Sequence, residues 1–237
     1  MNKEKCTAII LAAGKGTRMG TKIHKQYLEI CGRPVLYYAL NAFEKSEIID
    51  DIILVTGADE IEYCKNEIVD KYGISKVRHV VAGGKERYNS VYNGLKLVDK
   101  GYVFIHDGAR PFIEEDSIKR VYKMVKTEKA CVVAMPVKDT IKISDENEYV
   151  KSTPDRSTVW MVQTPQVFSA DLIKEAYDKI MATDCKGVTD DAMVVEQTMN
   201  HKVKFSEGSY MNIKITTPED LEIGELFINR LSKHLQN

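Results

Sequence analysis

The chain has 237 residues, a length expected for one large domain or two small ones. Hydrophobic residues make up 43% and charged residues 29%, proportions that are ordinary for a globular protein with a buried core. A formal net charge of −1 excludes a general basic field that would hold a nucleic-acid backbone, so any anion site has to be built locally.

The cysteine pattern and the lengths of the apolar runs indicate in which cellular compartment the protein is expected. The 5 cysteines are scattered, with no C-x-x-C pair, as is typical of free thiols in a reducing compartment and not of a disulfide framework or a zinc site. No stretch approaches the roughly eighteen apolar residues of a membrane helix. The apolar run Cys6–Ala13 is short and ends at charged residues, unlike a signal peptide. We therefore expect a cytosolic protein that binds neither membrane nor nucleic acid.

Short β-branched runs alternate with segments of helical period along the chain. In chain order the pattern predicts strand 7–11, helix 35–43, strand 51–55, helix 60–72, strand 77–81, helix 87–97, strand 102–105, helix 116–126 and strand 131–135. It then predicts helices 172–181 and 190–198, strand 202–206 and a last helix from Pro218. This alternation favours an α/β fold, a largely parallel sheet with helices on both faces. Without repeats or a low-complexity linker, residues 1–237 are expected to form one domain.

One region interrupts the alternation. Residues 140–143 and 149–152 are predicted to form two short strands around a polar turn, with little to bury. The hairpin is either a surface β-loop or an arm that reaches a partner subunit, and the residues alone leave both interpretations open.

The strongest motif is the glycine-rich loop over residues 11–20, directly after the first predicted strand. Its glycines allow backbone N–H groups to converge on phosphate oxygens, and the cations Arg18 and Lys25 follow. Met19 stands where both the dinucleotide and the Walker patterns require glycine. A plain glycine turn is the alternative, but the cations and the place after a strand favour a phosphate site.

Three further positions suit ligand binding. Gly83 and Gly84 with Ser90 allow close approach to a flat base, although paired glycines alone more often mark a tight turn. Asp107 follows a strand, where a carboxylate binds Mg²⁺ shared with substrate phosphates or, alternatively, caps a helix. Lys214 lies in an apolar, strand-like run, where a lysine is costly unless an anion such as phosphate pairs with it.

His106, beside Asp107, lacks the His or Cys neighbours of a zinc site. We interpret it as a packing or hydrogen-bonding histidine.

Together these blocks resemble the 2-C-methyl-D-erythritol 4-phosphate cytidylyltransferases of the non-mevalonate isoprenoid pathway. The resemblance spans nearly the whole chain and rests on LAAGKGTRMG (11–20), KQYL (25–28), GGKERYNSV (83–91), HDGARPFI (106–113), PVKDTIK (136–142), Arg156 with VWMVQTPQVF (159–168), TDDA (189–192) and NIKITTPEDL (212–221). The first block is common to many nucleotidyltransferases, whereas the set in this order is specific. His24 departs from the family, which commonly has proline before the lysine.

The resemblance implies a Rossmann-like nucleotidyltransferase domain that transfers CMP from CTP to 2-C-methyl-D-erythritol 4-phosphate, with Mg²⁺ or another divalent cation. It implies nucleotide-binding residues Ala12, Ala13, Gly14, Gly16, Gly84, Ser90 and Asp107, the last also holding the metal, and catalytic cations Arg18, Lys25 and Lys214. The polyol-phosphate site is expected at Arg110, Thr140, Arg156, Thr164 and Thr189.

In that family, residues matching Thr140 and Arg156 reach in from the partner subunit on a swapped β-arm. The resemblance therefore favours the arm interpretation for residues 137–158 and predicts a homodimer.

Three rival functions remain. A ribitol-5-phosphate cytidylyltransferase shares the glycine loop, the KQ block and the NIKITTP block, and a sugar-1-phosphate nucleotidylyltransferase shares only the first loop. The segments 139–142 and 156–160 favour methylerythritol phosphate. A nucleotide-binding regulator without turnover belongs to another class, and the presence of Arg18, Lys25, Asp107 and Lys214 argues against it.

Overall fold

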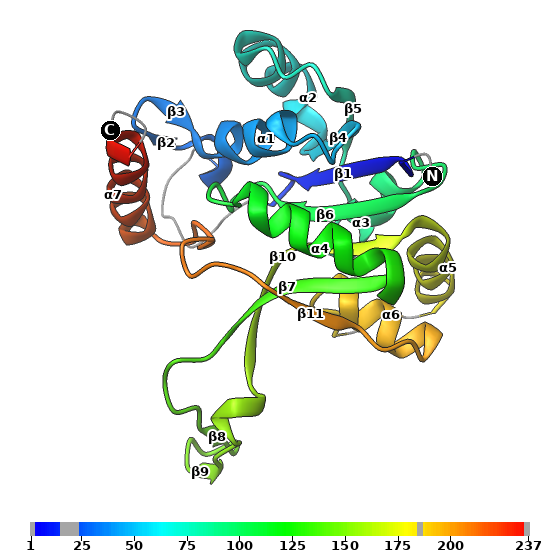
Figure 1. Ribbon diagram of the computed structural model, residues 1–237, viewed down its shortest axis with the longest axis vertical. Coiled ribbons are helices and arrows are strands. Elements are labelled where there is room, and N and C mark those ends of the chain that lie inside the picture. The colour runs from blue at the N-terminus through cyan, green and yellow to red at the C-terminus, as the bar shows by residue number, and fades with distance from the viewer. Residues whose placement is uncertain (1–2, 15–23, 184–186, 235–237) are drawn as a thin grey trace.

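A central sheet organises the protein. The computed structural model describes residues 3–14, 24–183 and 187–234, and side chains as far as residue 230. Within these ranges seven strands form one sheet in the order β11-β7-β10-β6-β1-β4-β5 (Figure 1). The strands are β1 (Cys6–Leu11), β4 (Asp51–Thr56), β5 (Val77–Ala82), β6 (Tyr102–Asp107), β7 (Ala130–Pro136), β10 (Trp160–Ser169) and β11 (Lys204–Glu207).

The strand pairing confirms the predicted α/β fold with a largely parallel sheet. Strand β1 runs parallel to β4 and β6, β4 is parallel to β5, and β7 is parallel to β11. Within the seven strands of this sheet, only β10 runs antiparallel to its neighbours, β6 and β7. The parallel strands β1, β4, β5 and β6 therefore end at a common edge.

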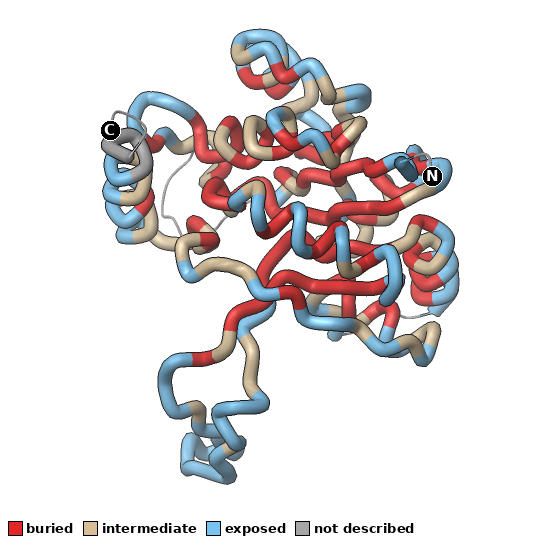
Figure 2. Tube along the Cα trace, viewed as in Figure 1, coloured by how far each residue is buried: buried red, intermediate tan, exposed pale blue. Residues whose placement is uncertain are grey.

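Helices cover both faces of the sheet. The helices of the described residues are α1 (Val35–Lys45), α2 (Ile61–Tyr63), α3 (Arg87–Leu95), α4 (Glu115–Glu128), α5 (Ala170–Met181), α6 (Asp191–Met199) and α7 (Pro218–His234). One core lies between the sheet and helices α1 and α4. A second lies between the opposite face of the sheet and helices α3, α5 and α6. Alternate residues of a strand serve the two cores, as Ile10 and Ile9 do on β1, because successive side chains point to opposite faces. Figure 2 shows the buried residues along the sheet and the inner helix faces.

A third, smaller core anchors the last helix. The two-residue strands β2 (Glu29–Ile30) and β3 (Arg33–Pro34) pair antiparallel, and α7 lies beside them (Figure 1). Ile30, Val35, Phe112 and Ile215 are buried there. This packing fixes the segment before α7 against the segment after β6.

Strand β10 is the main element that the sequence pattern does not predict. It contains Pro165, which removes a ladder donor and argues against a central strand. The pairing with β7 shifts register between Val162 and Gln166, so the proline occupies an irregular stretch where the ladder is interrupted.

Two other predictions need correction. The predicted helix 60–72 is a 3-10 turn (Ala58–Glu60), the short α2 and a π-helical stretch (Cys64–Asp70). The hairpin strands are shorter than predicted, β8 (Ile143–Ser144) and β9 (Val150–Ser152), because few side chains there have anything to pack against. The hairpin projects away from the sheet and is mostly exposed (Figures 1 and 2).

The cysteines within the described ranges are free thiols, as the scattered pattern predicts. Cys6, Cys64 and Cys131 are buried, and burial raises the pKa of Cys6 and of Cys131 to about 12. Across the described residues, no helix has the length and apolar character that crossing a membrane requires.

Because β6 lies in the middle of the sheet, truncation of a buried side chain on this strand is expected to destabilise the fold strongly. Phe104 is 0% exposed on this strand, whereas Leu226 on α7 is 68% exposed. Phe104→Ala is expected to lower the free energy of unfolding by about 3–5 kcal/mol, because it leaves a cavity in close-packed surroundings. Leu226→Ala should change it by less than about 0.5 kcal/mol. Urea unfolding followed by circular dichroism measures both, and equal losses would contradict the assignment of the core.

Candidate functional site

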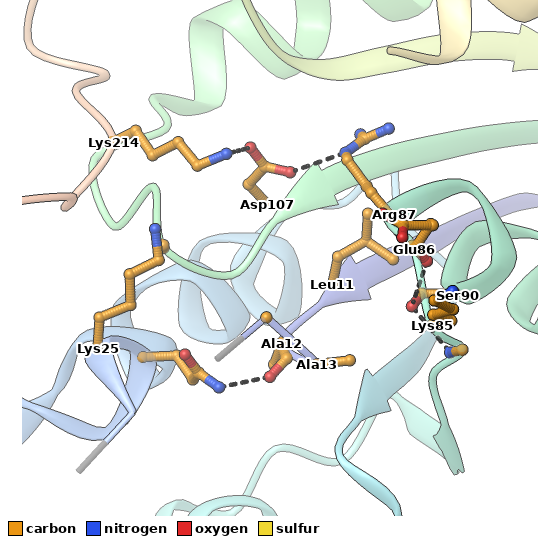
Figure 3. A pocket seen from close by; sticks show the side chains of 14 residues that line it. Leu11, Ala12, Ala13, Lys25, Lys85, Glu86, Arg87, Ser90, Asp107 and Lys214 are labelled. Carbon is orange, nitrogen blue, oxygen red and sulfur yellow. Dashed lines mark hydrogen bonds and ion pairs between the residues drawn. The ribbon is translucent and has the colours of Figure 1, made fainter. Parts of the chain in front are cut away.

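A cleft of about 660 Å³ opens where β1, β5 and β6 end. Its volume lies within the usual range of small-molecule sites, and the carboxyl ends of parallel strands are the usual place for them. Figure 3 shows Lys25 and Lys214 at one end of the cleft and Lys85 and Ser90 at the other. The lining residues are Leu11, Ala12, Ala13, Gly14, Lys25, Gln26, Gly84, Lys85, Glu86, Arg87, Ser90, Asp107, Ala109 and Lys214.

The two glycine segments pack against each other at the floor of the cleft. A Cβ on Gly83 would lie 2.5 Å from the Cβ of Ala13, so only glycine allows this close approach. The amide of Gly84 donates to Ser90 Oγ at 3.0 Å. Among the described residues, a Cβ on Gly14 would meet no atom within 4 Å.

Lys25 reaches the cleft from the 3-10 helix Lys25–Tyr27. The next residue, Gln26, is 2% exposed, and its Nε2 donates to the carbonyl oxygen of Ala12 at 2.5 Å. This buried hydrogen bond fixes the helix beside the glycine turn. Gly16 and Arg18, two residues predicted for the site, lie outside the described residues.

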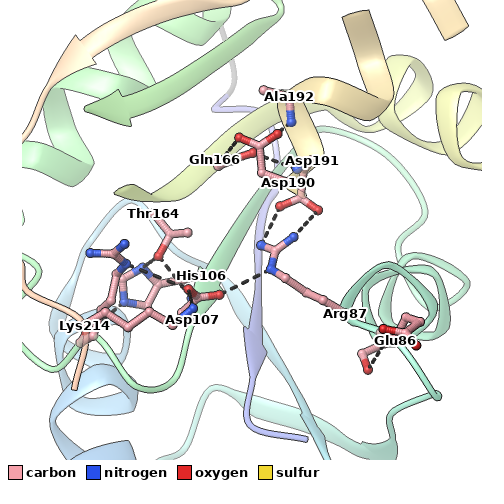
Figure 4. Close-up of polar contacts among 12 residues, drawn as sticks. Glu86, Arg87, His106, Asp107, Thr164, Gln166, Asp190, Asp191, Ala192 and Lys214 are labelled. Atoms are coloured by element: carbon pink, nitrogen blue, oxygen red, sulfur yellow. Dashed lines mark hydrogen bonds and ion pairs between the residues drawn. The ribbon is translucent and has the colours of Figure 1, made fainter. Parts of the chain in front are cut away.

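Asp107, the last residue of β6, is surrounded by cations (Figure 4). Its Oδ2 lies 2.7 Å from Lys214 Nζ and 3.8 Å from Arg110 Nε, and its Oδ1 lies 3.5 Å from Arg87 Nε. Burial alone would raise the pKa of Asp107, but the charges of Arg87, Lys214 and Arg110 outweigh it and hold the pKa well below its ordinary value. The carboxylate therefore stays ionised near neutral pH. It ends a strand and does not cap a helix.

A hydrogen-bonded segment brings Lys214 to this carboxylate. Asn212 is 0% exposed, and its Nδ2 donates to the carbonyl oxygen of Thr164 on β10 at 2.9 Å. The amide of Ile215 donates to the carbonyl oxygen of Ala109 at 2.8 Å. The predicted strand-like run is an irregular segment, and the Lys214 side chain, 38% exposed, takes Asp107 as its anionic partner.

Arg87 and Asp191 form a buried ion pair that the sequence did not reveal. Both Nη atoms of Arg87 donate to the Asp191 carboxylate, at 2.9 and 2.7 Å, and Asp191 is 0% exposed. The buried Tyr177 hydroxyl donates to the same carboxylate at 2.6 Å. Gln166 on β10 accepts from the Asp191 amide at 3.0 Å. Arg87 thus links the start of α3, the end of β6 and the start of α6.

The residues predicted for the acceptor site lie in different places: Arg110 and Thr164 are next to Asp107, whereas Thr189 is exposed. Arg110 lies beside Asp107 and donates through Nη1 to the carbonyl oxygen of Asn212 at 2.8 Å. Thr164 is buried behind Asp107, where its Oγ1 accepts from the Asp107 amide at 3.1 Å. Thr189 is exposed, two residues before Asp191. None of the three lines the cleft.

Thr140 and Arg156 lie on the hairpin arm and are not brought to the cleft of their own chain. Arg156 donates through Nη1 to the carbonyl oxygen of Lys138 at 3.1 Å, a contact within the arm.

His106 is a buried, hydrogen-bonding histidine, in line with the prediction of a packing or hydrogen-bonding role. It is 0% exposed, its Nδ1 lies 2.9 Å from Thr164 Oγ1, and its Nε2 lies 3.0 Å from the carbonyl oxygen of Arg110. Burial lowers its pKa to about 4, so the ring is neutral near pH 7.

The donor set of the cleft fits one mode of metal binding. The described residues contain no group of three or more His, Cys, Asp or Glu side chains that could hold a metal ion by themselves. Asp107 is an ionised carboxylate on the cleft wall, and Mg²⁺ at nucleotide sites is bound by one or two carboxylates together with substrate phosphates. The site therefore fits a divalent cation that arrives with a phosphate ligand.

The parallel sheet, the glycine turn and the cations around one cleft define a nucleotidyltransferase-type α/β protein. The family model of IspD, 2-C-methyl-D-erythritol 4-phosphate cytidylyltransferase, matches residues 6–230. The chain belongs to this family.

Similar proteins agree. The 2-C-methyl-D-erythritol 4-phosphate cytidylyltransferase of Lachnospira eligens is 54% identical over 224 residues, which cover 94% of this chain and 98% of that protein. The crystal structure of 4-diphosphocytidyl-2C-methyl-D-erythritol synthase from Anaerococcus prevotii is 37% identical, with a TM-score of 0.84, and the match covers 96% of this chain and 100% of that one. The crystal structure of the Francisella tularensis 2-C-methyl-D-erythritol 4-phosphate cytidylyltransferase is 31% identical, with a TM-score of 0.79, and the match covers 94% and 99% of the two chains.

The Arg87–Asp191 pair predicts a large stability effect away from the cleft surface. Asp191→Asn leaves the Arg87 guanidinium without its buried counter-charge, and should lower the free energy of unfolding by about 3 kcal/mol. This is the lower end of the range for buried pairs, because the Arg87 side chain is 30% exposed. Asp171→Asn, at an exposed position on α5, should change it by less than about 0.5 kcal/mol. Urea unfolding of both variants is the measurement, and an Asp191→Asn protein as stable as wild type would show that the pair contributes no net stability.

Proposed function

We propose that this chain transfers the cytidylyl group of CTP to 2-C-methyl-D-erythritol 4-phosphate and releases pyrophosphate. The observation that carries the proposal is the convergence of Lys25 and Lys214, from opposite ends of the chain, on one cleft with the glycine turn. Membership of the family and the names of its relatives agree with this reaction.

Charge neutralisation is the main task of such a site. The reaction brings two polyanions together, and each pair of like charges about 4 Å apart costs roughly 4 kcal/mol at an effective dielectric near 20. We assign Arg18, Lys25 and Lys214 to the phosphates of CTP, where their charges offset this repulsion and stabilise the transition state. The backbone of Ala12, Ala13, Gly14 and Gly16 is assigned to the phosphate end of the nucleotide.

The acceptor needs no general base. A phosphate monoester carries nearly two negative charges near neutral pH and is already a nucleophile. One of its oxygens attacks the α-phosphorus of CTP in line, and pyrophosphate leaves opposite. His106, next to Asp107, is buried and neutral, and both of its ring nitrogens face protein oxygens. Positioning and electrostatics therefore carry the catalysis.

The ends of the cleft suit different parts of the nucleotide. Gly84 and Ser90 lie opposite the two lysines and offer a close backbone approach and a small hydroxyl for the base (Figure 3). Asp107 is the residue we assign to Mg²⁺. When bound, the cation would neutralise phosphate charge.

The acceptor site is proposed to be shared between two subunits. Arg110 Nε is a buried donor without a hydrogen-bond partner among the described residues, which suits an incoming phosphate oxygen. We assign Thr164 and Thr189 to the same region. Thr140 and Arg156 do not reach their own cleft, which supports their delivery by the arm of a partner in a homodimer.

We also infer one domain over residues 1–237, with residues 137–158 as the dimerisation arm. The free thiols support a cytosolic location.

Ribitol 5-phosphate differs little in chemistry from the proposed acceptor, so a direct assay separates the functions. Purified protein with CTP and Mg²⁺ should release pyrophosphate at least about tenfold faster with 2-C-methyl-D-erythritol 4-phosphate than with ribitol 5-phosphate or a sugar 1-phosphate. A preference for ribitol 5-phosphate would change the substrate. No release with any acceptor would point to a regulator without turnover.

Lys25→Ala tests the charge on the phosphates. The variant is expected to lower kcat by about 10²–10³-fold, with the KM for CTP changed by less than about threefold, because the charge matters most in the transition state. Lys119→Ala, an exposed lysine on α4, should leave both constants unchanged. Steady-state pyrophosphate release measures these values, and an unchanged kcat for Lys25→Ala would end the assignment.

The shared acceptor site predicts complementation between two defective variants. Arg156→Ala should raise the KM for the polyol phosphate and leave the KM for CTP nearly unchanged. A dimer of one Arg156→Ala and one Lys25→Ala subunit has one site with both residues intact if the arm acts in trans. After subunit exchange, about half of the dimers are mixed, so about one quarter of the wild-type activity should return at low acceptor concentration. No recovery with confirmed mixed dimers would show that the arm serves its own chain.

A further inference from the structure

The residues on either side of Lys25 and Gln26 are held by one carboxylate outside the cleft. Glu60 ends the 3-10 turn after β4, and its side chain is 16% exposed. Its Oε1 lies 2.5 Å from His24 Nδ1, and its Oε2 accepts from the Tyr27 hydroxyl at 3.0 Å. Glu60 is absent from the cleft lining, so any effect on the reaction has to pass through its neighbours.

Glu60 is itself fixed by the end of β4. Its Oε2 also accepts from the Gly57 amide at 3.1 Å and from Thr56 Oγ1 at 3.2 Å. The Tyr27 hydroxyl lies 2.9 Å from the same Thr56 oxygen and 3.2 Å from Cys64 Sγ. These contacts attach the carboxylate to the end of β4, a strand of the central sheet.

We propose that Glu60 is a positioning residue that, through His24 and Tyr27, directs Lys25 toward the triphosphate. A lysine has a flexible four-carbon side chain, so its ammonium group acts at a defined point only if the backbone that carries it is fixed. Gln26 secures that backbone to Ala12 on one side, and Glu60 secures it on both flanks. This inference rests on the proposed role of Lys25 in cytidylyl transfer.

The backbone at His24 supplies an independent test. Its φ of −65° is the value that a proline ring holds without side-chain contacts, and its ψ of 139° is in a region that proline adopts readily. If the contact with Glu60 serves only to fix this backbone, His24→Pro replaces it, whereas His24→Ala does not.

The first experiment compares Glu60→Gln with Glu62→Gln in pyrophosphate release. Glutamine keeps the size of Glu60 but removes its negative charge and replaces one oxygen with an NH₂ group, so it cannot reproduce both the close contact with His24 and the hydrogen bond accepted from Tyr27. We expect kcat to fall by about tenfold or more with the KM for CTP within about twofold. Glu62 is 76% exposed and contacts Lys65, so its variant should match wild type. An unchanged kcat for Glu60→Gln would overturn the proposal, and so would a fall of kcat and CTP affinity together.

The second experiment asks for rescue. His24→Ala should lower kcat severalfold, and His24→Pro should return it to within about twofold of wild type. If Glu60→Gln does not fold, Tyr27→Phe removes one contact of Glu60 with little change of shape, and should also lower kcat with the KM for CTP unchanged. Equal loss in His24→Ala and His24→Pro, together with full activity of Tyr27→Phe, would overturn the proposal.

A readout without turnover separates this inference from the proposed function. Amide ¹⁵N order parameters of residues 24–27 should fall in Glu60→Gln and stay unchanged in Glu62→Gln. A wild-type protein that releases no pyrophosphate with any acceptor contradicts the proposed function, while lower order parameters in Glu60→Gln would still support the positioning role of Glu60. An active wild type with unchanged order parameters and kcat in Glu60→Gln contradicts only the positioning role.

Discussion

The gathering of positive charge around Asp107 is the interaction on which the site depends. Lys214, Arg87 and Arg110 come from three separate segments, and without an anion between them they would repel one another. One ionised carboxylate at the end of β6 holds them at the cleft while leaving the surroundings cationic. The chain as a whole has a formal net charge of −1, so a region that attracts anions has to be built locally. The cations around Asp107 form such a region.

The same constraint explains why a remote helix belongs to the site. Arg87 cannot be balanced by Asp107 alone, since that carboxylate already contacts Lys214 at 2.7 Å. Asp191 supplies the second negative charge, and its 0% exposure is tolerated because Arg87 and Tyr177 satisfy both of its oxygens. The antiparallel β10 completes the arrangement, because Gln166 accepts from the Asp191 amide and Thr164 accepts from the Asp107 amide. The charge at Asp107 is therefore linked, through Arg87, to Asp191 at the start of α6.

Local signals in the sequence predicted the parts of the site that follow directly after strands. The glycine turn with Lys25, the Gly84–Ser90 segment and Asp107 all meet at the predicted edge, because parallel strands order their carboxyl ends by topology alone. The pairing of Arg87 with Asp191 was invisible, since it joins residues 104 positions apart and neither pattern nor spacing marks it. Strand β10 was missed because Pro165 opposes a central strand locally, and only the surrounding tertiary ladder overrides that preference. The hydrophobic period also could not distinguish the π-helical stretch over 64–70 from a regular helix.

The path of β7 and β10 is consistent with the proposal that the acceptor site is shared between two subunits. Both strands pair within the sheet as far as Pro136 and Trp160, and beyond this point the chain leaves the core to form the arm. The arm exposes the large hydrophobic side chains of Ile143, Tyr149 and Val150. Apolar side chains grouped on a surface are typical of an interface, and a partner subunit would cover them. Thr140 and Arg156 lie on the same arm. The arm therefore carries both the apolar side chains for the proposed interface and the residues assigned to the acceptor phosphate. In the proposed dimer, subunit association and acceptor binding would depend on one segment of chain, whereas the residues that line the nucleotide cleft come from a single chain.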